Sequence, residues 1–97
     1  MEKITVIVPC YNEQEVVEKF HAEVSHALQE VTDCEFTYLF INDGSADGTL
    51  ALLQAMARRE PSVRYLSLSR NFGKEAAMLA GLDYAEGDAV IIMDADL

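Results

Sequence analysis

The sequence predicts an α/β protein in which four parallel strands form one sheet with helices on its faces. Two observations indicate this class: runs rich in β-branched residues alternate with stretches of helical periodicity, and the connections between them are short. Strand–helix–strand units of this kind cross over in a right-handed sense. We therefore expect the spatial strand order 3-2-1-4, with the direction of progression reversing between the first and fourth strands.

The first half of the chain contains two strands and two helices. Residues 4–8 are a continuous apolar run that Pro9 is expected to end, which is typical of a strand buried on both faces. Apolar residues recur along one stripe of residues 13–31 and indicate an amphipathic helix. Residues 36–41 form the second strand, and residues 49–59 form the second helix.

The second half continues the alternation. Residues 63–68 form the third strand, residues 74–85 the third helix and residues 89–93 the fourth strand. The third helix is apolar almost all round, so we expect it to be buried. Gly87 fits the end of this helix, because glycine readily adopts the conformation that follows a helix.

Composition limits the classes of function. The 97 residues suffice for one domain with a modest core, and 51% of them are hydrophobic, which excludes a disordered acidic tail. A net charge of −10 argues against a nucleic-acid-binding surface. An anionic ligand would therefore have to be held by backbone dipoles or a metal ion. No apolar stretch approaches the roughly 20 residues that span a bilayer, so we expect these residues to be soluble.

The cysteines and histidines do not suggest a site. Cys10 and Cys34 make no disulfide framework and lack the spacing of metal ligands, so both are expected to be reduced thiols in or near the core. His21 and His26 point apart on the first predicted helix, and we interpret them as structural or surface residues.

Polar clusters follow the predicted strands, at residues 10–13, 42–45, 70–74 and 94–96. In a sheet of this order, ligands bind at the carboxyl ends of the strands, where the strand order reverses. Four clusters at one edge of the sheet therefore predict a binding site.

Asp94 and Asp96 come directly after the fourth strand. Being two residues apart, their carboxylates can project to the same side, and adjacent carboxylates are costly unless a cation lies between them. Oxygen ligands of this kind suit Mg²⁺ or Mn²⁺. The alternative is a solvated or capping pair beyond the end of a strand.

The other clusters are open to two interpretations each. Asp43 could accept hydrogen bonds from a base or a ribose, or it could be a turn residue. Residues 9–13 offer the Tyr11 ring for stacking beside polar groups, or they form an ordinary loop. Arg70 and Lys74 could hold an anion at a helix start, or they could be solvated.

The chain lacks the motifs of two other protein classes with similar topology. A dinucleotide-binding Rossmann domain requires a glycine-rich turn after the first strand, where this chain has residues 9–13 instead, and a Walker A loop is also absent. A response-regulator-like receiver would not place an Asp-X-Asp sequence after its fourth strand.

Four segments resemble the family 2 (GT-A) glycosyltransferases: residues 8–13, 42–49, 69–77 and 93–97. The nearest resemblance is to the polyprenyl-phosphate branch, which includes bactoprenol glucosyltransferases and dolichol-phosphate-mannose synthases. It implies that residues 1–97 are the N-terminal, nucleotide-sugar-binding part of a glycosyltransferase domain. The implied fold is the nucleotide-binding half of a GT-A fold, a Rossmann-like parallel sheet with flanking helices.

The resemblance also implies roles for individual residues. It assigns the donor nucleotide to residues of the first three clusters and the donor diphosphate to a divalent cation, Mg²⁺ or Mn²⁺, held by a DXD motif. The implied substrate-binding residues are Pro9, Tyr11, Asn12, Glu13, Asp43, Arg70, Lys74, Asp94 and Ala95, and the implied metal-binding and catalytic residues are Asp94 and Asp96.

The implied reaction is metal-assisted, inverting transfer of a hexose from a nucleotide-diphospho-sugar, expected to be UDP-linked, to a polyprenyl phosphate in cell-envelope glycan assembly. Members of the branch continue beyond the point that corresponds to Leu97 with acceptor-binding elements and membrane helices. We therefore expect a longer parent at the cytoplasmic face of the cell membrane, and residues 1–97 alone to be inactive and prone to self-association. The alternatives are a nucleotide-binding or assembly module without transferase activity, or a transferase with a saccharide acceptor.

Overall fold

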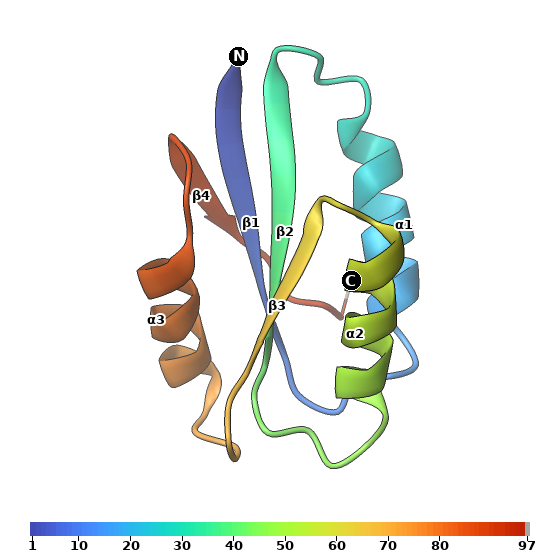
Figure 1. Ribbon diagram of the computed structural model, residues 1–97, viewed down its shortest axis with the longest axis vertical. Coiled ribbons are helices and arrows are strands. Elements are labelled where there is room, and N and C mark those ends of the chain that lie inside the picture. Colours follow the sequence, from blue (N-terminus) through green and yellow to red (C-terminus); the bar gives the residue numbers. More distant parts are fainter. Residues whose placement is uncertain (97) are drawn as a thin grey trace.

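The computed structural model describes residues 1–96, and its four parallel strands form one sheet in the order β3-β2-β1-β4 (Figure 1). The predicted fold class and strand order are thus confirmed. The strands are β1 (Glu2–Cys10), β2 (Cys34–Asn42), β3 (Val63–Ser67) and β4 (Ala89–Ile92), and the helices are α1 (Val17–Leu28), α2 (Thr49–Arg59) and α3 (Lys74–Tyr84).

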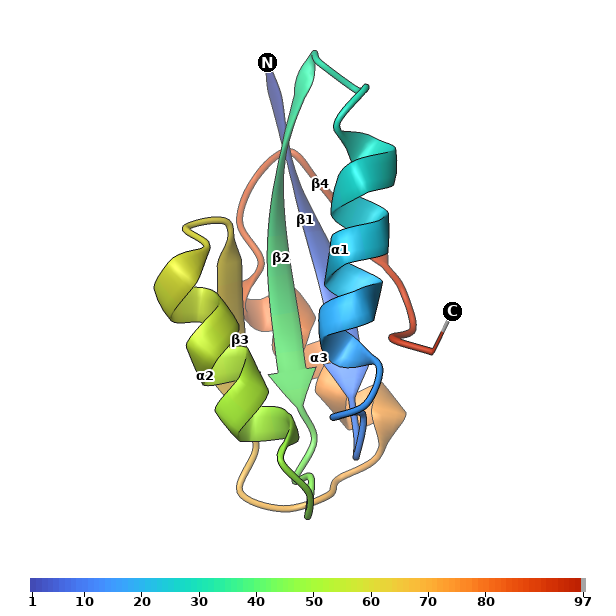
Figure 2. The same ribbon diagram turned by 90° about the vertical axis from the view of Figure 1, so that its right-hand side faces the viewer.

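Helices cover both faces of the sheet, with α1 and α2 on one face and α3 on the other (Figures 1 and 2). Alternate residues of β1 point to opposite faces, as the pleat of a strand requires. Val6 and Val8 pack in the core beneath α1 and α2, whereas Ile7 packs with Ala77 of α3. The central strands β1 and β2 are therefore buried on both faces, which explains their continuous apolar sequence.

Strand β1 does not end at Pro9 as predicted but continues to Cys10. Successive residues of a strand direct their backbone groups to opposite neighbours. Ile7 accepts a hydrogen bond from Met93 N on the β4 side, so Pro9, two residues on, faces that same side. The β1–β4 pairing extends only to Ile7, so the missing N–H of proline costs no ladder hydrogen bond.

Helix α1 is shorter than the predicted 13–31, because the residues before it bond elsewhere. The backbone N–H of Glu13 donates to Thr49 Oγ1 over 2.9 Å, and that of Gln14 donates to Asp47 Oδ2 over 3.3 Å. These bonds fasten the β1–α1 loop to the β2–α2 loop. The helix therefore starts only at Val17.

The expectation that the third helix is buried on all sides is wrong. Only Ala77 and Gly81 of α3 are buried against the sheet, while Leu79 is 64% exposed and Leu82 and Tyr84 are also exposed. A stripe of small residues lets the helix approach the sheet closely, and no element of residues 1–96 covers its outer side. None of the three helices in this range has the length and apolar character needed to cross a bilayer.

Candidate functional site

The polar clusters that follow the strands meet in one cavity of about 340 Å³ at the carboxyl edge of the sheet. It receives residues from the ends of β1 and β2, from the loop before α3 and from the segment after β4. The lining residues are Pro9, Cys10, Tyr11, Glu13, Asp43, Asn71, Gly73, Lys74, Asp94, Ala95 and Asp96. Eight of the ten predicted site residues therefore line this cavity, and Asn12 and Arg70 do not.

The β1 cluster places Tyr11 and Glu13 in the cavity but not Asn12. Asn12 adopts the left-handed conformation, with φ of 53°, and its Oδ1 accepts a hydrogen bond from Ala46 N over 2.8 Å. Its own N–H donates to Ser45 Oγ over 2.9 Å. Asn12 therefore joins two loops of the site, while the Tyr11 ring beside it is half exposed and accessible to a ligand.

Asp43 directly follows β2 in a buried position, with 3% of its surface exposed. Its carboxylate accepts hydrogen bonds from Phe72 N (2.8 Å) and Gly73 N (3.1 Å), and a third from Asn71 Nδ2 (3.1 Å). These bonds occupy three of roughly four acceptor positions on a carboxylate. Asp43 thus fixes the loop before α3 and retains little capacity for a ligand.

Gly44 allows this loop to come so close. Its φ is +65°, and a Cβ at this position would lie 2.2 Å from the backbone of Asn71. Asn71 and Gly73, which line the cavity, were not among the predicted site residues. Both lie in the polar cluster 70–74 that the sequence places at this edge, but the cluster does not show which of its residues face the cavity.

Lys74 is the first residue of α3, and its ammonium forms an ion pair with the Asp94 carboxylate. The hydrogen bond from Lys74 to Asp94 raises the pKa of the lysine. Lys74 is the one basic residue among those that line the cavity. Arg70 does not line it: the guanidinium carbon lies 4.7 Å from the centroid of the Phe72 ring, over its face.

Carboxylates outnumber this lysine in the cavity, which is lined by Glu13, Asp43, Asp94 and Asp96. Partial burial raises the pKa of the Glu13 carboxyl, and repulsion from Asp96 and Asp94 raises it further. Burial also raises the pKa of the Cys10 thiol to about 12, so this thiol stays protonated and is a poor nucleophile. The local excess of negative charge favours a cation.

Asp94 and Asp96 fit a divalent cation that shares its shell with a ligand. Ala95 between them is buried in the core beneath α1 and α2, and the two carboxylates line the cavity. Within residues 1–96, no three acidic, histidine or cysteine side chains are close enough to hold a metal ion unaided. Mg²⁺ is commonly held by one or two carboxylates, with phosphate and water completing its shell. Leu97, the last residue of the 93–97 segment, lies outside the described residues.

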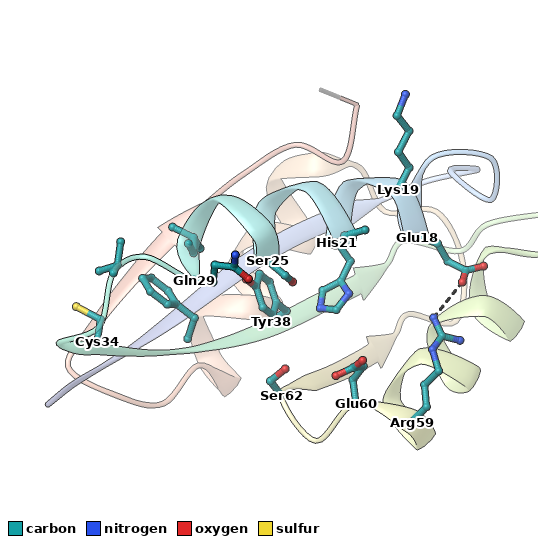
Figure 3. A pocket seen from close by; sticks show the side chains of 14 residues that line it. Glu18, Lys19, His21, Ser25, Gln29, Cys34, Tyr38, Arg59, Glu60 and Ser62 are labelled. Atoms are coloured by element: carbon teal, nitrogen blue, oxygen red, sulfur yellow. Dashed lines mark hydrogen bonds and ion pairs between the residues drawn. The ribbon is translucent and has the colours of Figure 1, made fainter.

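A second cavity, of about 790 Å³, lies over β2 between α1 and the end of α2 (Figure 3). Its wall includes His21, whose ring meets that of Tyr38 edge to face at 4.8 Å. Burial lowers the pKa of His21, which keeps the ring neutral in this contact. None of the four polar clusters lines this larger cavity. His21 packs against Tyr38, as expected of a structural residue, and the polar clusters line the smaller cavity instead.

The family model of glycosyl transferase family 2 matches residues 5–97. The bactoprenol glucosyl transferase of Shigella phage SfV is 48% identical over 95 residues, which are 98% of this chain and 31% of that relative. The prophage bactoprenol glucosyl transferase homolog of Escherichia coli (strain K12) is 46% identical over 95 residues, with the same coverage of both chains, 98% and 31%. This chain thus spans less than a third of the length of these curated relatives.

Solved structures share the fold. The mannosyltransferase PcManGT from Pyrobaculum calidifontis, in complex with GDP-Man and Mn²⁺, superposes with a TM-score of 0.81 at 28% identity, covering 98% of this chain and 28% of that one. Residues 1–349 of S. aureus TarS, in complex with UDP-GlcNAc, give a TM-score of 0.79 at 28% identity, covering 97% and 26%. The sheet is that of a GT-A fold, and the resemblance of the four segments is confirmed: this chain belongs to glycosyl transferase family 2.

Proposed function

We propose that this chain is the nucleotide-sugar-binding part of a hexosyltransferase that uses a UDP-linked donor and a polyprenyl phosphate acceptor. The observation that carries the proposal is the cavity at the carboxyl edge of the sheet, where an exposed aromatic ring, one ammonium and two adjacent carboxylates converge. A nucleotide diphosphate needs the same three features: a surface for its base, a positive group and a site for a cation.

The nucleoside would lie against the β1 side of the cavity. The exposed Tyr11 ring offers a stacking surface, with Pro9 and Glu13 beside it. Asp43, with one acceptor position left after its three bonds to the loop, would take a single donor from the base. Asn12 and Arg70 would act from outside the cavity, Asn12 through its loop contacts and Arg70 through its stacking on Phe72.

The diphosphate would lie between the start of α3 and the segment after β4. Asp94 and Asp96 would hold Mg²⁺ or Mn²⁺ there, and when bound this cation supplies positive charge against the departing nucleotide diphosphate. Lys74 and the amino end of α3 add a further positive field. The net charge of −10 is compatible with an anionic donor because this field is local.

The acceptor in our proposal is a lipid phosphate at the cytoplasmic face of a membrane. The names of the relatives, a bactoprenol glucosyl transferase and a bactoprenol glucosyl transferase homolog, support it. A phosphate oxygen is already ionised at neutral pH, so its attack on the anomeric carbon needs no general base. The bond from that carbon to the donor diphosphate breaks as the new one forms, which inverts the configuration.

Calorimetry of UDP binding to this chain tests the donor site. We expect UDP to bind more tightly in Mn²⁺ or Mg²⁺ than in chelator, because the cation joins the diphosphate to the carboxylates. Asp96→Asn should remove this metal dependence. Asp83→Asn, an equal change of charge at an exposed position of α3, should keep it. Equal affinity of the unaltered chain for UDP in metal and in chelator would refute the metal-assisted donor site.

Transfer itself is tested with a protein that carries this chain together with the further length of its relatives. Radiolabelled hexose should pass from the UDP-sugar to polyprenyl phosphate and be extracted with the lipid. Asp94→Ala should abolish the transfer, and residues 1–97 alone should show none. Label found only in soluble saccharides would contradict the lipid acceptor and leave the donor site standing.

A further inference from the structure

We propose that Lys74 is an internal counter-cation: it pairs with Asp94 while the donor is absent and moves to the donor diphosphate when nucleotide and metal bind. The inference rests on the proposed function for the identity of the donor. Its consequence is that Lys74 couples the binding of metal to the binding of nucleotide, because one ammonium is exchanged between two partners.

The position of Lys74 suits such an exchange. Its backbone follows Gly73, whose N–H donates to the buried Asp43 carboxylate, so the start of α3 is fixed. Its side chain is 57% exposed and the Asp94 side chain 51% exposed, so the ammonium is free to rotate on its four-carbon stem. A fixed backbone with a mobile charged end lets the same residue reach either partner.

The charges of the cavity give the exchange its direction. Lys74 is the one basic residue among the lining residues, against four carboxylates. Without a metal ion, its best partner is Asp94. A divalent cation that binds Asp94 must displace this ammonium and is also repelled by it. A diphosphate brings more than one negative charge to the same place and offers the displaced ammonium a new partner at the amino end of α3.

Two measurable consequences follow from this exchange. In the absence of nucleotide, Lys74 should lower the affinity of the site for a metal ion. In the presence of nucleotide, this penalty should disappear, so UDP should raise metal affinity by more than its own coordination of the metal accounts for. By linkage, metal should raise the affinity for UDP by the same factor.

The test is a titration of the chain with Mn²⁺, with free Mn²⁺ measured by electron paramagnetic resonance, in the absence and presence of UDP. We expect Lys74→Met to bind Mn²⁺ alone about two- to five-fold more tightly than the unaltered chain, the size expected for a half-exposed ion pair. In Lys74→Met, the gain in Mn²⁺ affinity on adding UDP should be smaller than in the unaltered chain. Lys74→Gln should behave in the same way, and Lys74→Arg should stay close to the unaltered chain because the counter-charge is kept.

Lys19→Met is the matched control. It removes the same charge from an exposed position on α1, where Lys19 pairs with Glu23 at 3.9 Å. If Lys74→Met and Lys74→Gln bind Mn²⁺ alone no more tightly than Lys19→Met, the counter-cation role is wrong. If UDP does not bind the unaltered chain even with Mn²⁺, the proposed function fails instead, and the titration with Mn²⁺ alone still decides whether Lys74 competes with the metal.

Discussion

Asp43 shows how a residue at a ligand site can act chiefly on the protein itself. Its sequence context, a carboxylate at the end of a strand beside a glycine, indicates a ligand contact equally well as a turn. The structure gives its carboxylate three hydrogen bonds to residues 71–73, and two of the donors are backbone N–H groups. The largest effect of this side chain should therefore be on the loop that precedes α3.

We expect Asp43→Asn to lower the free energy of unfolding by about 1–3 kcal/mol, because an amide NH₂ would replace one oxygen that accepts from a buried donor. In a domain of this size, each kcal/mol corresponds to roughly 4–8 °C in Tm. Urea and thermal denaturation measure the loss. Asp83→Asn, exposed on α3, is the control and should change Tm little.

Affinity for UDP should also fall in Asp43→Asn, since the loop that carries Lys74 loses its anchor. A variant with normal Tm and weakened UDP binding would show that Asp43 is mainly a base ligand. A variant normal in both respects would mean that the loop holds its position without these bonds.

At the level of elements, α3 depends on close approach rather than on large apolar side chains. Its buried face consists of Ala77 and Gly81, which lie over Ile7 and Ile41 of the central strands. A Cβ on Gly81 would come within 2.6 Å of Ile7 Cγ2. Ile7 is fully buried, and its β-branched side chain is stiff at χ1.

Gly81→Ala should therefore destabilise the protein although alanine is the better helix former. The gain in helix propensity is about 1 kcal/mol. Overpacking against a rigid core side chain costs about 1–3 kcal/mol, so we expect a net loss. Ala80→Gly, at the neighbouring, partly buried position, is the reference for the propensity difference and is measured by chemical denaturation. If Gly81→Ala stabilises the protein by as much as Ala80→Gly destabilises it, α3 moves outward at no cost.

The order and type of the elements were predictable because periodicity and turn residues report on them directly. Helix 49–59 agrees with α2 to the residue. Details that depend on a partner segment were not predictable. That Pro9 stays within β1 follows from where the β4 ladder stops, and the start of α1 at Val17 follows from hydrogen bonds to the β2–α2 loop.

The same distinction holds for the site. The meeting of four clusters at one edge follows from strand order alone, so most of the lining residues could be named from the sequence. Lys74 pairs with Asp94, which lies 20 residues further along the chain, and Asp43 accepts hydrogen bonds from a loop that begins 28 residues further along. Both contacts depend on side-chain geometry between distant segments. No local pattern carries that information. The cluster 70–74 was predicted for the same edge, but which of its residues face the cavity was not, so Asn71 and Gly73 were not named individually.

For the molecule as a whole, charge and apolar surface act in opposite directions. The net charge of −10 makes copies of the chain repel one another. Apolar residues are nevertheless exposed on the outer side of α3 and on the edge strand β4, both of which lie at the left of Figure 1. They are Leu79, Leu82, Tyr84, Val90, Ile91 and Ile92. Within residues 1–96, β4 pairs with β1 on one side only, so it is also an edge strand.

We expect this surface to make the 97-residue chain self-associate when salt screens the repulsion. The Debye length falls from about 10 Å at 0.1 M to about 3 Å at 1 M salt, whereas the attraction between apolar surfaces persists. Sedimentation should show a weight-average mass that rises with protein concentration, more steeply at 0.5–1 M than at 0.05 M salt (roughly the range over which screening becomes complete).

Ile91→Lys should suppress the rise, because a charge on an edge strand opposes strand pairing between copies. Val31→Lys, which alters an equally exposed apolar residue after α1, should leave it unchanged. A monomer at every protein and salt concentration would show that the repulsion and the short length of β4 suffice to keep the edge unpaired. Equal suppression by both variants would show that net charge alone, and not the β4 edge, controls association.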